Sequence, residues 1–238
     1  MRGIVEALRK HTCLDFLSPG TGAASPWEVR RWLPAIGLLA GLLVAWIHLP
    51  IAELLLPADV ALVAAMALQA FLLNFGPEQA LCRGVSRSPE TAGIATAALT
   101  LCLLAKFVIY RQFLPPEIGR VLVLGTTAAL TGPLLLAARM RPTSQPDHIP
   151  PPPGLFSVSV LLLWIAVAAL IASAGGDFGH AIRTTVCIVA GTALVQIIGA
   201  AWVREQHGGL PAPLLLMFSL PCEIAACAGL LMARSQFL

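Results

Sequence analysis

The sequence predicts an all-α membrane protein, a polytopic bundle of about seven transmembrane helices. Seven apolar stretches fill most of the 238 residues, and each is long enough, or nearly so, to cross about 30 Å of hydrocarbon as a helix of roughly 20 residues. They are 33–49, 58–75, 92–109, 121–138, 155–174, 184–203 and 210–233. Only 11% of the residues are charged, against about 25% in a soluble domain, which disfavours a water-soluble bundle. We therefore expect one transmembrane domain over 33–238, helical because a backbone in lipid must satisfy its own hydrogen bonds.

The segment 1–32 precedes the first apolar stretch and predicts a short helix in the membrane interface. Ile4, Leu8 and Leu14 can share one apolar face. The charged residues opposite that face are Arg2, Glu6, Arg9 and Lys10. A stretch rich in Gly, Ser and Pro then ends the helix. A solvated tail is the alternative interpretation.

The basic residues predict an orientation. With a cytoplasmic N-terminus, ten of the fifteen Lys and Arg residues fall on the inner side and four on the outer side, with Lys106 inside a helix. The inner set is Arg2, Arg9, Lys10, Arg30, Arg31, Arg83, Arg87, Arg139, Arg141 and Arg204. We expect a multi-pass protein of the cell inner (plasma) membrane, with a Pro-rich inner loop at 139–154. The net charge of +3 is small and indicates no nucleic-acid partner.

Three ionisable residues within the apolar stretches stand out, because charge there is costly and marks an interior or a water-filled cavity. Lys106 can neutralise an anionic ligand, pair with Glu223, or reach the interface along its own aliphatic chain. Glu223 is flanked by apolar residues on both sides and must be paired or protonated. His48, beside Pro50, is expected to be a boundary residue.

Small residues and prolines predict where helices pack or bend. The Gly37-x-x-x-Gly41 spacing permits close helix contact. Pro211, Pro213 and Pro221 interrupt the last apolar stretch, which predicts a kink because proline lacks a backbone N–H.

Carboxylates for metal chemistry are few. Glu78 follows Asn74 by four residues, so the two would share one face of a helix. One carboxylate and one amide make a poor magnesium site, and the spacing alone favours simple helix-end polarity as the explanation of the pair. The sequence contains no P-loop, no dinucleotide-binding fingerprint, and no metalloprotease or serine-hydrolase motif.

The order of several short motifs nevertheless matches a known family. Gly208-Gly209 opens the C-terminal region, and Glu223 follows in the last apolar stretch. In the middle, Ser86-Arg87 and Gly93 precede an apolar run that ends at Leu104-Ala105-Lys106. Before and at the start of the first apolar stretch, the corresponding residues are Phe16-Leu17, Trp32-Leu33-Pro34 and Gly37. Over nearly its whole length the chain resembles the membrane-bound cobalamin synthases, the adenosylcobinamide-GDP ribazoletransferases.

The chain departs from this family at the acidic residues. The family has an Asp-Gly-x-x-Asp-x-x-Asp run, and here the three aspartate positions are Asn74, Glu78 and Leu81. Of two family glutamates in the last helix, the second matches Glu223 and the first matches Leu220.

The resemblance implies a transferase of late cobalamin biosynthesis that joins α-ribazole to adenosylcobinamide-GDP and releases GMP. By the same resemblance Glu78 and Glu223 would hold Mg²⁺, and Asn74 would orient it. The residues implied to bind substrate are Arg83, Arg87, Lys106, Gly208 and Gly209.

Two other functions remain open from the sequence. A catalytically retired homologue would bind a corrinoid or a lipid-like ligand, or would act as a scaffold in a membrane complex or homo-oligomer, and the lost aspartates favour it. A small transporter is indicated only by the kinked last stretch with its glutamate.

Overall fold

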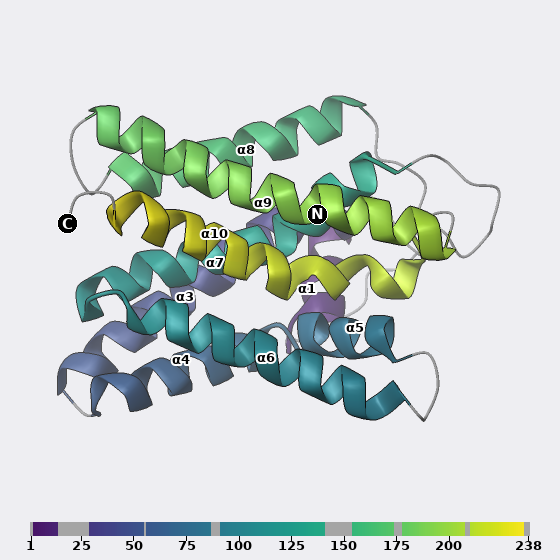
Figure 1. Ribbon diagram of the computed structural model, residues 1–238. Coiled ribbons are helices and arrows are strands. Elements are labelled where there is room, and N and C mark those ends of the chain that lie inside the picture. Colours follow the sequence, from purple (N-terminus) through teal and green to yellow (C-terminus); the bar gives the residue numbers. More distant parts are fainter. Residues whose placement is uncertain are drawn as a thin grey trace.

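The computed structural model describes residues 2–13, 29–54, 56–86, 91–140, 154–173, 178–207 and 210–235 (Figure 1). Its elements are α1 (Arg2–His11), α3 (Leu33–Leu54), α4 (Ala58–Leu72), α5 (Gly76–Val85), α6 (Ala92–Arg111), α7 (Pro115–Ala138), α8 (Gly154–Ser173), α9 (Phe178–His207), the 3-10 helix η2 (Ala212–Phe218) and α10 (Ser219–Ser235). Among the described residues, six helical segments are long and apolar enough to cross a membrane, or up to seven if the bent pair α4–α5 forms one span. The predicted all-α polytopic bundle is confirmed.

Helix α7 lies at the centre of the bundle. Its apolar segment is 94% buried, against 61% or less for the other candidate spans, and α3, α8, α9 and α10 all pack against it. Hydroxyl side chains tolerate this position because they bond within their own helix. Thr126 donates to the Leu122 carbonyl at 2.6 Å, and Thr127 donates to the Val123 carbonyl at 2.7 Å. These two hydroxyls are therefore paired within the central helix, whereas the buried Thr131 hydroxyl of α7 has no hydrogen-bond partner among the described residues.

The contact between α3 and α7 depends on two glycines. A Cβ on Gly37 would lie 2.7 Å from the Thr126 carbonyl oxygen, and one on Gly41 would lie 2.8 Å from Val123 Cα. Both obstacles are backbone atoms, which cannot rotate away. The close helix contact predicted from the Gly37-x-x-x-Gly41 spacing is therefore confirmed, and it lies within one chain.

The outward faces of the peripheral helices are apolar. Trp46 on α3, Leu101 on α6, and Leu155 and Leu170 on α8 are all strongly exposed. A water-soluble protein rarely exposes so many large apolar side chains on its long helices. These faces fit the hydrocarbon of a lipid bilayer.

The second apolar stretch does not form one helix. Helix α4 ends at Leu72, and α5 begins at Gly76 after a bend of 80°. Pro77 lies in the first turn of α5, and because it has no N–H to donate, the hydrogen bonds of α4 cannot continue through it. The predicted span 58–75 is thus shorter than expected, and much of the predicted loop 76–91 is helical.

The end of α1 stabilises this break. The Cys13 N–H donates to the Leu72 carbonyl at 3.1 Å, so one carbonyl freed at the end of α4 is satisfied by the N-terminal segment. Asn74 and Phe75 both have φ = 51°, in the left-handed region that non-glycine residues rarely adopt. Such strained backbone often accompanies a functional site, and it lies next to the cavity described below.

The last apolar stretch is also interrupted. It begins with η2, which packs against α5 and α7, and continues as α10 from Ser219. Pro211 precedes η2, and Pro221 lies in the first turn of α10, where its missing N–H has no helical partner to lose. The interruption predicted from the prolines is therefore a 3-10 segment that precedes the α-helix. In Figure 1, η2 and α5 lie in the same half of the bundle.

Candidate functional site

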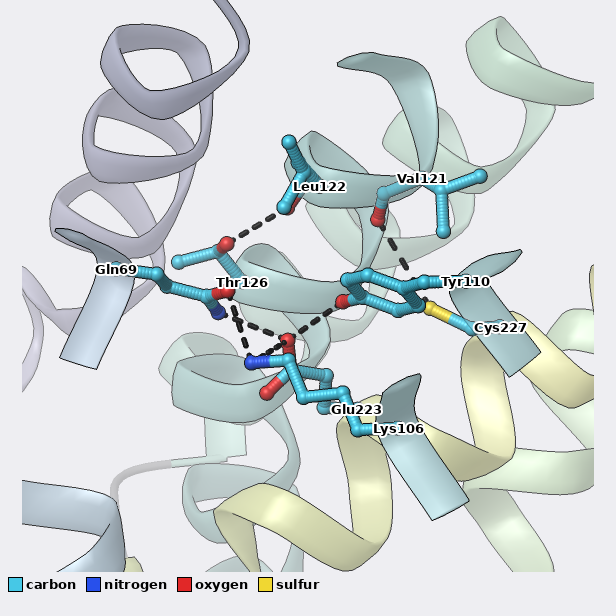
Figure 2. A network of polar contacts seen from close by, with 8 residues as sticks. All are labelled: Gln69, Lys106, Tyr110, Val121, Leu122, Thr126, Glu223 and Cys227. Atoms are coloured by element: carbon cyan, nitrogen blue, oxygen red, sulfur yellow. Dashed lines mark hydrogen bonds and ion pairs between the residues drawn. The ribbon is translucent and has the colours of Figure 1, made fainter. Parts of the chain in front are cut away.

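A buried ion pair lies between α6 and α10. Lys106 Nζ is 2.9 Å from Glu223 Oε1, and the two side chains are only 3% and 1% exposed. Figure 2 shows the pair enclosed by helices and joined to further polar side chains. Among the three sequence-based interpretations of Lys106, pairing with Glu223 describes the structure, and an extended reach to the interface does not.

Two neutral side chains complete the network around Glu223. Gln69 of α4 donates through Nε2 to Glu223 Oε1 at 2.8 Å and accepts from Lys106 Nζ at 2.9 Å. The Tyr110 hydroxyl, from α6, donates to the same carboxylate oxygen at 2.6 Å. Glu223 Oε1 therefore receives three donors, from Lys106, Gln69 and Tyr110 (Figure 2).

The central helix leaves room for this network at one residue. A Cβ on Gly125 of α7 would lie 2.3 Å from the Tyr110 hydroxyl oxygen and 3.0 Å from Glu223 Cγ. The network thus joins α4, α6 and α10 over a glycine of α7. Because the positive and negative charges lie together in a region of low dielectric, removing either one would strand the other.

Sequence reasoning missed Gln69 and Tyr110, although both carried a signal. Tyr110 is the only tyrosine of the chain and follows Lys106 by four residues, on the same helix face. Gln69 is the only amide within the predicted span between Asp59 and Asn74. His48, predicted as a boundary residue, is 2% exposed and packs inside the bundle in the C-terminal part of α3.

The structure places the two residues predicted to hold Mg²⁺, Glu78 and Glu223, in different surroundings. Glu223 is neutralised by Lys106, and no group of three or more His, Cys, Asp or Glu side chains converges anywhere in the described part of the chain. Glu78 is partly buried, and its Oε2 has no hydrogen-bond partner among the described residues. It lies within electrostatic range of Lys106 and Glu223, but one carboxylate does not make a magnesium clamp.

The expected pairing of Asn74 with Glu78 on one helix face is also wrong. Asn74 belongs to the turn between α4 and α5, whereas Glu78 lies in the first turn of α5. The physical reason is the helix break at Pro77, which changes the direction of the chain between the two residues.

Asn74 instead lines a cavity of about 540 Å³ at this helix break. The cavity lies between α1, the approach to α3, α5 and η2. Its polar lining consists of Glu6, Lys10, His11, Arg30, Asn74, Gln79 and Arg83. Arg83 is exposed, and its Nη2 donates to Gln79 Oε1 at 3.4 Å. Of the residues predicted to bind substrate, Arg83 reaches this cavity, Lys106 is in the buried network, and Arg87, Gly208 and Gly209 lie outside the described residues.

Positive charge at the cavity acts on His11. Burial, followed by the charges of Lys10 and Arg30, lowers the pKa of His11 from its ordinary 6.5 to about 4. Burial also lowers the pKa of the Arg30 guanidinium. His11 is therefore neutral at pH 7, and the cavity presents three cations and the Glu6 carboxylate.

Wild-type protein is expected to lose stability relative to a His11→Gln variant as the pH falls from 6.5 towards 4. In this window the unfolded chain binds a proton at His11 and the native chain does not, so acid favours unfolding. Glutamine takes up no proton, and its melting profile lacks this contribution. Thermal midpoints measured across this pH range in detergent would test the prediction. Parallel profiles for the two proteins would contradict it.

Comparisons with protein-family models, curated proteins and solved structures find no match to this chain.

Proposed function

We propose that this chain is a catalytically retired homologue of the membrane-bound cobalamin synthases. In this proposal it binds a corrinoid or lipid-like ligand in the membrane. One observation carries the proposal: the carboxylate predicted to hold Mg²⁺, Glu223, is neutralised by Lys106 within a buried network. A carboxylate oxygen that already receives three donors is poorly disposed to ligate a metal ion.

The transfer reaction needs more carboxylates than this site offers. Displacement of GMP from a diphosphate requires cations that neutralise charge developing on the phosphate oxygens. Glu78 alone remains near the predicted position, because Asn74 and Leu81 replace two family aspartates. The chain forms a helical bundle but lacks the carboxylates that the family uses as metal ligands. This combination favours ligand binding over catalysis.

The position of the cavity suits a ligand that enters from the cytoplasm. The positive-inside rule assigns Lys10, Arg30 and Arg83 to the cytoplasmic side, and all three line the cavity. We therefore propose the inner (plasma) membrane as the location, with the cavity opening towards the cytoplasm.

Purified protein in proteoliposomes is expected to form neither cobalamin nor GMP from adenosylcobinamide-GDP, α-ribazole and Mg²⁺. The physical reason is the missing metal clamp, and chromatography of the products would measure the outcome. An active member of the transferase family, reconstituted in the same way, is the positive control.

Turnover by this chain would overturn the proposal if it disappeared in a Glu78→Gln variant. That substitution removes the carboxylate of Glu78 while preserving the size of the side chain, and size-exclusion chromatography would confirm that the variant folds. Turnover that survived Glu78→Gln and persisted in the presence of EDTA would equally overturn it, because catalysis would then proceed without the predicted metal ligand.

A further inference from the structure

The cavity at the helix break is built from four separate parts of the chain. Lys10 and His11 come from α1, Arg30 from the approach to α3, Gln79 and Arg83 from α5, and an apolar wall from η2. Segments so distant in sequence enclose about 540 Å³, far more space than a simple inorganic anion fills. The volume falls within the range of small-molecule binding sites.

The charge on its wall is predominantly positive. Among the described lining residues, Lys10, Arg30 and Arg83 are cations, and Glu6 is the only carboxylate. Asn74 and Gln79 add amide groups that can donate hydrogen bonds. Guanidinium groups present paired donors that match phosphate oxygens, and the lysine ammonium supplies a further charge.

The imidazole of His11 responds to the positive charges around the cavity. Its pKa is lowered to about 4 by burial and by the charges of Lys10 and Arg30. Glu6 and Arg83 are the other charged groups at the cavity, from α1 and α5. A multiply charged anion placed among these cations would relieve their repulsion and that on His11.

The wall also includes apolar side chains. Val29, Leu73, Leu215 and Leu216 line the same cavity. A ligand that satisfies both parts has an anionic end and a hydrophobic body. Such a ligand could be a phospholipid or a larger phosphate ester, and the shared chemistry is the phosphate group.

We propose that this cavity binds the phosphate or diphosphate group of an amphipathic ligand, held by Lys10, Arg30 and Arg83. The inference rests on the proposed function, because both require that the protein binds a ligand. It adds the chemical class of that ligand. It does not depend on whether the chain retains turnover.

Binding would be measured on the full chain in dodecyl maltoside micelles, whose detergent carries no phosphate, by isothermal titration calorimetry. The probes are inorganic pyrophosphate, dioctanoyl phosphatidic acid and, as a phosphate-free control, dioctanoylglycerol. We expect Lys10→Gln and Arg83→Gln each to weaken binding about tenfold or more, because each removes a charge-assisted hydrogen bond. Arg9→Gln is the matched control, since Arg9 precedes Lys10 on α1 but does not line the cavity.

The pattern of binding identifies the source of the phosphate. Pyrophosphate binding that is lost in both variants supports a soluble phosphate ester, whereas binding of phosphatidic acid alone supports a lipid. In either case, NMR titration of the unsubstituted protein should show that the bound ligand raises the pKa of His11. Loss of folding in a variant would not produce this change. Binding of neither phosphate probe, equal binding of dioctanoylglycerol, or weakening by Arg9→Gln to the same extent would overturn the proposal.

These outcomes are separable from those of the turnover assay. Absence of phosphate binding with no turnover would leave a retired scaffold whose ligand binds elsewhere. Phosphate binding at this cavity in a protein with metal-dependent turnover would preserve the cavity assignment and overturn the retired scaffold.

Discussion

Replacing Lys106 with methionine is expected to lower the free energy of unfolding by about 3–5 kcal/mol, because it leaves the Glu223 carboxylate buried and without its counter-charge. Glu223 is 1% exposed, so water cannot replace the lost ammonium group. Gln69 and Tyr110 would still donate to the carboxylate, but neither carries a charge. Thermal unfolding in detergent, followed by size-exclusion chromatography, would measure the loss.

The double variant Lys106→Met/Glu223→Met separates charge stranding from loss of packing. Removing both charges leaves no ion to desolvate, so we expect the double variant to recover much of the stability lost by the single variant. Lys10→Met is the matched control, since Lys10 is exposed and its replacement strands no buried charge. A double variant less stable than Lys106→Met would contradict the account, because the pair would then contribute more than the cost of burying it.

The sequence was sufficient to predict the helical bundle and the interruption of its last stretch, but not the break between α4 and α5. Hydropathy reports whether a residue prefers lipid, and residues 58–75 are predominantly apolar, so hydropathy predicts the stretch as one span. The break depends on Pro77, just beyond the apolar run, and on the Cys13 N–H that satisfies the Leu72 carbonyl. The second contact joins distant parts of the chain and has no local sequence signal.

The two charged residues of the candidate site could be predicted from the sequence, but the arrangement of the site could not. Lys106 and Glu223 stood out because charge is rare in apolar helices, and their pairing was one of the alternatives. Choosing it required the rotational positions of α6 and α10, since Tyr110 and Glu223 are 113 positions apart. The role of Gln69 likewise depends on a contact across 154 positions.

The cavity illustrates the same limit. Lys10 and Arg30 contributed to the predicted orientation as two basic residues among many. Only the docking of α1 near the α4–α5 break brings them together with Arg83 and Asn74. Charge counting predicts a side of the membrane for these residues, whereas tertiary packing brings them together at one cavity.

Valine in place of Gly41 is expected to destabilise the bundle by about 1–3 kcal/mol or more, because the added side chain meets backbone. A Cβ at this position would lie 2.8 Å from Val123 Cα and 3.2 Å from the Leu122 carbonyl oxygen. Relief requires α3 to move away from α7, the most buried helix of the described bundle. The thermal midpoint in detergent should therefore fall, with a further fall in a Gly37→Val/Gly41→Val double variant.

Gly93→Val provides the matched control, because a Cβ at Gly93 meets nothing within 4 Å. Both substitutions replace a helical glycine with the same β-branched residue, so their difference isolates the clash between α3 and α7. Unchanged stability in Gly41→Val would contradict close packing at this contact. Equal losses in Gly41→Val and Gly93→Val would instead assign the effect to the valine substitution itself.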